Sequence, residues 1–217
     1  MNRKALIGIT IGVLLLSLAC SFGPSGGGGG GGQPSNVIFQ DDFSDAKSGW
    51  EVGDYETGKV GYGNGVYYVI SNGNGDTMWG VANKKFDNVI IDVDATQISA
   101  GPDSNNDYGI LCREQGDGNG YFFLISGDGF YSILKAEGGE FTPLVDWTAS
   151  DVINTGNASN HIQATCNGGS LILTVNGQQL ATANDTAYSS GDIALTATSY
   201  ESQPTEVHFD NLVVSKP

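Results

Sequence analysis

The chain has 217 residues, including 33 glycines, and its 24 acidic side chains far outnumber its 9 lysines and arginines. A formal net charge of −15 excludes nucleic acid as a partner, because such binding needs basic side chains that neutralise phosphates. It equally argues against electrostatic docking on an anionic membrane. With 39% apolar residues, the chain can bury one sizeable core but is too short for two.

The N-terminus has the pattern of a bacterial lipoprotein signal. Arg3 and Lys4 precede an apolar run over residues 5–16, which is signal-peptide length and short for a membrane span. The run ends in Leu-Ser-Leu-Ala-Cys, which resembles a lipobox whose cysteine, here Cys20, becomes the lipidated first residue. The alternative is an ordinary secretory signal that leaves an unmodified cysteine. We predict a signal peptide over residues 1–19. Cleavage would leave 7 basic and 24 acidic residues, a net charge of −17.

Residues 20–36 contain seven consecutive glycines, which cannot bury apolar surface and behave as a flexible coil. A linker of this length has an r.m.s. reach of roughly 20–25 Å. The sequence therefore predicts a domain over residues 37–217, exported and tethered by lipid to a bacterial cell envelope, facing the outside or the periplasm.

Beyond the linker, short apolar runs alternate with Gly, Asn and Asp. In residues 87–97, Val89, Ile91 and Val93 share one face while Asp92 and Asp94 share the other, which is typical of a half-buried strand with a solvent-facing acidic side. Residues 170–179 alternate likewise and reach an Asn-Gly pair that favours a type I′ hairpin. Further strands are predicted over 37–43, 66–71, 77–83, 108–114, 121–126, 130–136, 141–147, 161–166, 192–198 and 206–215. The pattern predicts an all-β, antiparallel two-sheet sandwich.

Several segments carry a family resemblance. They read DDFSD…SGW at residues 41–50, DYGILCREQGDGNGYFFLISGDGFYSILK at 107–135, and then LILTVNGQQLA, SSGDIALTA and VHFDNLVV. Together they resemble the concanavalin A-like jelly roll, in the laminin-G-like and 3-keto-disaccharide-hydrolase-like branch found in bacterial surface proteins. The resemblance extends over residues 39–214 and implies the fold. It does not fix the function, because this fold hosts lectins, carbohydrate-binding modules, glycanases and adhesion domains.

Two cysteines remain in the domain, Cys112 and Cys166. Each shares a strand face with apolar residues, and an exported domain preserves disulfides. We predict a bridge between them. The alternatives are two separate buried thiols or a metal site, for which two cysteines without nearby histidines are weak support.

No catalytic constellation is evident. His161 and His208 both lie in predicted strands, and neither a G-x-S-x-G nor an H-E-x-x-H motif occurs. The resemblance to jelly-roll glycanases implies acidic residues at alternate positions, as E-x-D-x-E. The nearest segment, residues 51–56, has one residue too many between its first two acids, and we interpret it as a solvated loop.

Sugar binding requires flat aromatic faces and a few planar polar groups. Arg113 follows Cys112, so strand alternation places it on the concave surface of the curved sheet if Cys112 points inward. Further candidates for that surface are Tyr131, Lys135, Trp79 and Tyr108. The alternative is that these aromatic residues belong to the core and that Arg113 pairs with a carboxylate.

A structural calcium ion is the one cofactor that the sequence suggests. Asp42 near the start of the domain and Asp210 near its end would come together if the terminal strands pair. Jelly-roll binding modules resemble this arrangement. However, Asp and Asn are also the residues that turns require.

The sequence thus favours a cell-surface lipoprotein with a non-catalytic, lectin-like domain whose partner is a glycan or polysaccharide. One alternative is a glycoside hydrolase of the 3-keto-disaccharide type. Another is a structural or protein-adhesion module without a small ligand.

Overall fold

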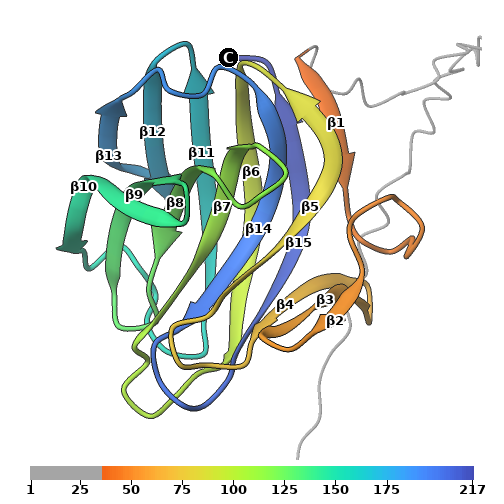
Figure 1. Ribbon diagram of the computed structural model, residues 1–217, viewed down its shortest axis with the longest axis vertical. Helices are drawn as coiled ribbons and strands as arrows, with labels where there is room; N and C mark the ends of the chain where they lie inside the picture. Colours follow the sequence, from red (N-terminus) through yellow and green to blue (C-terminus); the bar gives the residue numbers. More distant parts are fainter. Residues whose placement is uncertain (1–35) are drawn as a thin grey trace, which may run out of the picture. The chain divides into compact units, whose positions relative to one another are not determined.

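The computed structural model describes residues 36–217, which form a sandwich of fifteen strands in two antiparallel sheets (Figure 1). This confirms the all-β jelly-roll prediction. The predicted signal peptide, the lipidated Cys20 and most of the linker lie outside the described residues. Within residues 36–217, no helix has the length and apolarity needed to cross a membrane.

The larger sheet has nine strands in the order β13-β12-β11-β6-β15-β4-β3-β2, with β1 also paired to β15. Its strands are β1 (Val37–Asp41), β2 (Gly53–Tyr55), β3 (Gly58–Gly63), β4 (Val66–Ser71), β6 (Val89–Ser99), β11 (Ser159–Asn167), β12 (Ser170–Val175), β13 (Gln178–Asn184) and β15 (Thr205–Ser215).

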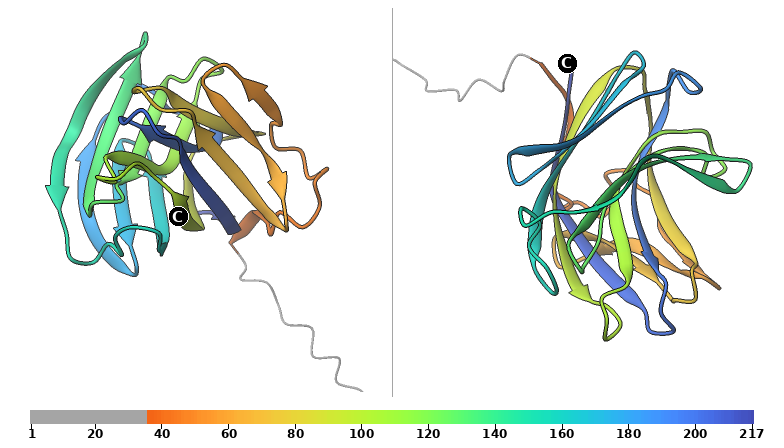
Figure 2. Two further views of the ribbon diagram at one scale, coloured as in Figure 1. Left: turned by 90° about the horizontal axis from the view of Figure 1, so that it is seen from below. Right: turned by 90° about the vertical axis from the view of Figure 1, so that its left-hand side faces the viewer.

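The smaller sheet has six strands in the order β10-β9-β8-β7-β14-β5. These are β5 (Thr77–Phe86), β7 (Asn106–Glu114), β8 (Gly120–Ile125), β9 (Phe130–Glu137), β10 (Glu140–Ala149) and β14 (Gly191–Ser199). Seen edge-on, the two sheets form separate layers (Figure 2).

Two short strands differ from the sequence prediction. The solvated loop predicted over residues 51–56 contains β2, which pairs with β3, and β3 in turn pairs with β4. Their glycine-rich sequences have little strand propensity of their own, so β3 forms by pairing with β4, and β2 forms by pairing with β3. Every other strand overlaps a predicted one.

The main core lies between the sheets. It is joined covalently by the predicted disulfide, which connects Cys112 on β7 to Cys166 on β11 and thus links the two layers. At one end of the core, Phe43, Trp50 and Tyr67 form a tight aromatic group, with ring centroids 5.1–5.6 Å apart. Such pairs add stability beyond the apolar area that they bury.

The two sheets differ in how their strands are buried. Along β6, buried residues alternate with half-exposed ones, as expected when only one face meets the core. In contrast, β7 and β14 are buried at all nine of their positions. The core covers just one face of the six-stranded sheet. Because the residues on the other, outer face of β7 and β14 are also buried, that face must be recessed. A second apolar cluster occupies that face.

Candidate functional site

The outer face of the six-stranded sheet has a continuous apolar floor. Strand register aligns one row of side chains across five strands, and directly opposed residues point to the same face. The row consists of Val81, Ala194, Leu111, Phe122 and Leu134. Because Ile110 and Cys112 belong to the main core, Leu111 between them faces outward.

One part of this face is a hollow of about 230 Å³ with aromatic rims, which we call the aromatic hollow. Phe141 and Trp147 on β10 and Tyr200 after β14 line it, and they remain 47%, 39% and 48% exposed. Phe141 also packs edge-on against Phe122 on the floor, with ring centroids 5.1 Å apart. Large aromatic side chains that stay exposed around an apolar hollow are typical of a ligand site.

A buried carboxylate lies in the aromatic hollow. Asp107 is only 2% exposed, and Tyr200 Oη donates a hydrogen bond to its Oδ2 at 2.6 Å. Burial raises the pKa of Asp107 to about 6, although hydrogen bonds from Tyr200 and Thr198 oppose the shift. Keeping a carboxylate in such a place costs stability, which is a pattern common at functional sites.

Polar groups continue the aromatic hollow on one side. A neighbouring hollow of about 240 Å³ shares Trp147 and Tyr200 with it. Asn105, Asn106 and Asp128 are among its other lining residues. Amide and carboxylate groups beside an aromatic surface are the arrangement that orients sugar hydroxyls.

A larger hollow of about 610 Å³ lies at the other end of the face, beside the edge strand β5, and we call it the acidic hollow. Its lining includes the aromatic residues Trp79 and Tyr55, the carboxylates Glu51, Glu114 and Asp192, and Lys85. The segment around Glu51 forms one wall, because the Glu51 N–H donates to the Val81 carbonyl at 2.9 Å. Tyr55 Oη in turn donates to Glu51 Oε1 at 2.5 Å.

A β-bulge brings two of these carboxylates together. Ile193 pairs with Cys112 and Asp192 pairs with Glu114, so Arg113 is an extra residue in β7 with a left-handed φ of 59°. Without the bulge, alternation would turn Glu114 toward the core. With it, Glu114 lies opposite Asp192 on the outer face.

Backbone N–H groups hold both carboxylates. Glu114 Oε1 accepts from Gly116 at 2.7 Å and Gly118 at 2.8 Å. Asp192 Oδ1 accepts from Lys84 at 3.0 Å and Ile193 at 2.8 Å. Burial raises the pKa of Asp192; the two N–H groups counter this shift, and the nearby charge of Glu114 adds to it.

The predicted ligand residues are dispersed. Trp79 lies in the acidic hollow, as expected for the outer face. Placing the others on that face was wrong. Tyr108 is 0% exposed in the core, and its hydroxyl oxygen is 3.2 Å from Asn160 Nδ2. Tyr131 also packs against the core. Lys135 lies opposite the core residue Tyr121 in the register, and it forms an ion pair with Glu137 at 3.1 Å.

Arg113 does not project from the sheet either. The bulge redirects its side chain, which is 1% exposed. Its guanidinium donates to the carbonyls of Asp87 at 3.0 Å, Gly168 at 2.9 Å and Tyr188 at 2.8 Å. Arg113 therefore ties three loops together, and no carboxylate forms an ion pair with it within residues 36–217.

The two predicted metal ligands have separate partners. The terminal strands do pair, with Asp41 opposite Leu212. Asp42, however, accepts hydrogen bonds from Ser44, whereas Asp210 lies opposite Asp94 in the sheet register. Asp41 Oδ2 is buried without a partner beside a hollow that Asp42 also lines. In the described part of the chain, no three His, Cys, Asp or Glu residues are grouped to hold a metal ion.

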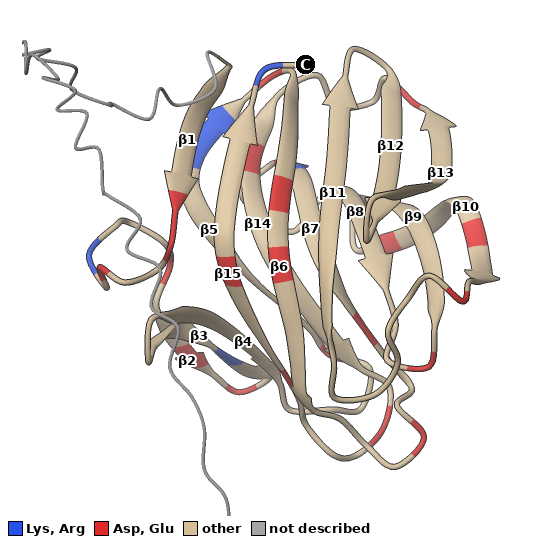
Figure 3. Cartoon of the chain, turned by 180° about the vertical axis from the view of Figure 1, so that it is seen from behind, with Lys and Arg blue, Asp and Glu red and all other residues tan. Residues whose placement is uncertain are grey.

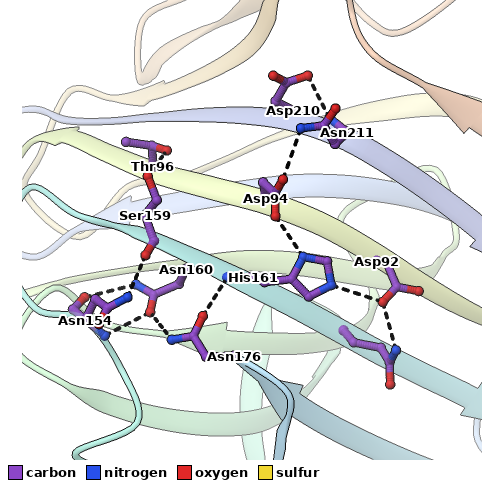
Figure 4. Close-up of polar contacts among 11 residues, drawn as sticks. Asp92, Asp94, Thr96, Asn154, Ser159, Asn160, His161, Asn176, Asp210 and Asn211 are labelled. Carbon is purple, nitrogen blue, oxygen red and sulfur yellow. Dashed lines mark hydrogen bonds and ion pairs between the residues drawn. The ribbon is translucent and has the colours of Figure 1, made fainter. Parts of the chain in front are cut away.

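The outer face of the nine-stranded sheet carries a polar network, with acidic residues along β6 and β15 (Figure 3). As Figure 4 shows, His161 lies between Asp94 and Asp92, with ring nitrogens 2.7 Å and 3.3 Å from their Oδ1 atoms. Asn211 Nδ2 donates to Asp94 Oδ2 at 3.0 Å. Burial opposes protonation of His161, but its hydrogen bonds to the two carboxylates outweigh burial and raise its pKa. The solvent-facing placement of Asp92 and Asp94 is confirmed.

Sequence reasoning missed most of the outer-face residues. Phe141 and Trp147 lie in a predicted strand, where the local pattern does not distinguish a core aromatic residue from one at the rim of a hollow. Tyr200 lies in a loop whose path depends on the finished sandwich. Glu114 needed the bulge, which the sequence shows only as a polar Arg-Glu pair at the end of a strand.

Comparison with solved structures identifies the class of fold. The carbohydrate-binding module CBM66 from Bacillus subtilis aligns with a TM-score of 0.56 and 17% identity, covering 78% of this chain and 96% of that one. The Bacillus licheniformis beta-glucanase aligns at 0.61 and 10%, covering 85% and 100%. The carbohydrate recognition domain of Emp47p aligns at 0.60 and 10%, covering 86% and 99%.

The fold is therefore that of the concanavalin A-like jelly-roll domains, as the sequence resemblance implied. No protein-family model matches the sequence. A comparison with curated proteins also finds no match.

Proposed function

We propose that this domain binds carbohydrate on the outer face of its six-stranded sheet, without catalysis. The observation that carries the proposal is the aromatic hollow, where Phe141, Trp147 and Tyr200 stay exposed above an apolar floor. Aromatic faces stack on the C–H faces of sugar rings, while the nearby carboxylate and amides accept and donate hydrogen bonds to hydroxyls. The structural neighbours include a carbohydrate-binding module and a carbohydrate recognition domain, which supports the same reading.

Binding is favoured over hydrolysis by the positions of the carboxylates. The alternate-acid strand implied by the resemblance to glycanases does not occur at residues 51–56, where Glu51 instead accepts a hydrogen bond from Tyr55. Glu114 and Asp192 are each anchored by two backbone N–H groups, an arrangement suited to a fixed recognition surface. The proposal includes display from a bacterial envelope through lipidated Cys20 and the glycine linker.

Polysaccharide pull-down followed by calorimetry tests the proposal. Trp147→Ala and Tyr200→Ala should each weaken binding by about tenfold or more, as expected for aromatic anchors. Tyr68→Ala is the matched control, because Tyr68 lies on the other sheet opposite His208. Equal binding by all variants would overturn the assignment of the face, and release of reducing sugar would favour the hydrolase alternative.

A further inference from the structure

The acidic hollow has features that the aromatic hollow lacks. Its volume of about 610 Å³ is enough for a sugar unit, and both Trp79 and Tyr55 line it. Gly116 also lines it, and Gly118 packs against Trp79, whose ring a Cβ on Gly118 would meet at 3.0 Å. The hollow is therefore an open recess on the same face, with aromatic surface available to a ligand.

Two nearly buried carboxylates offer a free oxygen in this pocket. Glu114 is 2% exposed and Asp192 is 7% exposed. In each carboxylate, only one oxygen accepts hydrogen bonds from the described residues. These oxygens are Glu114 Oε1 and Asp192 Oδ1. Each second oxygen thus lacks a protein donor, although both residues line the hollow. A carboxylate oxygen held rigidly in a recess is a strong acceptor for a charged donor.

The charge balance determines what kind of donor can enter. Glu51, Glu114 and Asp192 face a single cation, Lys85, which is exposed. An acidic sugar would be repelled, whereas a cation would be attracted. No grouping of three metal-ligating side chains occurs between residues 36 and 217. An organic ammonium uses both the carboxylates and the faces of Trp79 and Tyr55.

We propose that the acidic hollow binds the protonated amine of a sugar, so that the domain prefers glycans containing unacetylated amino sugars. This inference rests on the proposed function, because it names the substrate class of the same face. Thr77 lines both hollows, which are therefore adjacent. One oligosaccharide chain can lie in the aromatic hollow and place an amino sugar in the acidic hollow.

The test compares chitooligosaccharides of one length in N-acetylated and deacetylated form, by calorimetry below the pKa of the sugar amine. The protein should bind the deacetylated form about tenfold more tightly. Glu114→Gln and Asp192→Asn should each reduce that preference to about threefold or less. Glu206→Gln, which removes the same charge from the other sheet, should leave it unchanged.

A variant with little risk to folding supplies a second readout. Lys85 is exposed, and replacing it by Gln removes the only positive charge of the hollow, so the preference for the amine should increase. Equal affinity of the protein for both forms, or a preference that persists in Glu114→Gln and Asp192→Asn, would overturn the inference. If the acetylated form binds through Trp147 while the amine adds nothing, the proposed function stands and this inference alone fails. If neither form nor any neutral polysaccharide binds, both fail together.

Discussion

The outer faces of the two sheets differ in chemistry, one being polar and the other apolar, although side chains alternate between the two faces of both sheets. On the nine-stranded sheet, outward positions carry short polar side chains such as Asp92, Asp94 and His161, which bond to one another in contact with water. On the six-stranded sheet, outward positions carry Leu111 and Phe122, which are buried as deeply as the core. A two-layer protein needs only one apolar face per sheet. The second apolar face is bordered by large aromatic side chains that stay exposed, Phe141, Trp147 and Tyr200, and these support the proposed ligand surface.

The largest effect on stability should come from removing the disulfide that links the two sheets. Replacing Cys112 and Cys166 together by Ala removes a bridge across a sequence separation of 54 residues. The chain-entropy model predicts a loss of about 4 kcal/mol in the free energy of unfolding. In a domain of this size, the midpoint of thermal unfolding should fall by roughly 8–16 °C. An unchanged midpoint in the double variant would contradict a structural role for the bridge.

The next largest effect should come from Arg113, which lies at the end of the sandwich rather than on either outer face. Arg113→Ala leaves three carbonyls without their charged donor and should cost about 3 kcal/mol of stability. Arg113→Lys should rescue little, because an ammonium cannot reproduce the fork of the guanidinium. Glycan affinity of the folded fraction should not change. A stable Arg113→Ala protein that has lost binding would return Arg113 to the binding face.

A smaller effect on stability, of opposite sign, is expected when Asp107 is replaced. Because its pKa in the folded protein is raised to about 6, the protonated form is favoured by folding. The stability that this contributes is complete below the ordinary pKa of Asp and is lost as the pH rises toward 6. Asp107→Asn should therefore stabilise the protein at neutral pH by about 2 kcal/mol and flatten its pH profile between about 4 and 6. Superimposable pH profiles for the two proteins would contradict this account.

The smallest effect should come from the polar face. The raised pKa of His161 means that its stabilisation is present below the ordinary pKa of histidine and is lost as the pH rises through the folded value. Because the side chain is 46% exposed, water screens it, and His161→Gln should cost less than about 1 kcal/mol even in acid. Denaturant unfolding on both sides of that transition measures the difference. A much larger loss would mean that the two faces are not as different as described.

Local pattern predicted the two-sheet sandwich, because apolar and polar residues alternate along strands such as β6, and the family resemblance implied the jelly roll. Local pattern also predicted the disulfide, since both cysteines share strand faces with apolar residues. Prediction from local pattern failed where a bulge or other irregularity moved a side chain to a different face of its sheet. The bulge at Arg113 withdraws that side chain and exposes Glu114 to the acidic hollow instead. Likewise, β3 forms by pairing with β4 and β2 forms by pairing with β3, and their glycine-rich sequences do not reveal it.

The sequence predicted the sheet face on which the proposed binding surface lies, but not most of the residues that line it. Trp79 lies on the outer face as predicted, whereas Tyr108 and Tyr131 pack in or against the core. An aromatic residue in a strand has the same local pattern whether it fills the core or lines a rim. The distinction depends on which strand lies at a sheet edge and where the following loop folds, as for Trp147 on β10 and Tyr200 after β14.

The central claim is that glycan binds the outer face of the six-stranded sheet, and the three tryptophans test it most directly. Trp147 and Trp79 line the two hollows, whereas Trp50 is 4% exposed in the core. In an NMR titration with a chitooligosaccharide, the indole N–H signals of Trp147 and Trp79 should shift while that of Trp50 stays in place. Unmoved signals of Trp147 and Trp79, together with shifts around His161 and Asn211, would place binding on the other sheet and contradict the account.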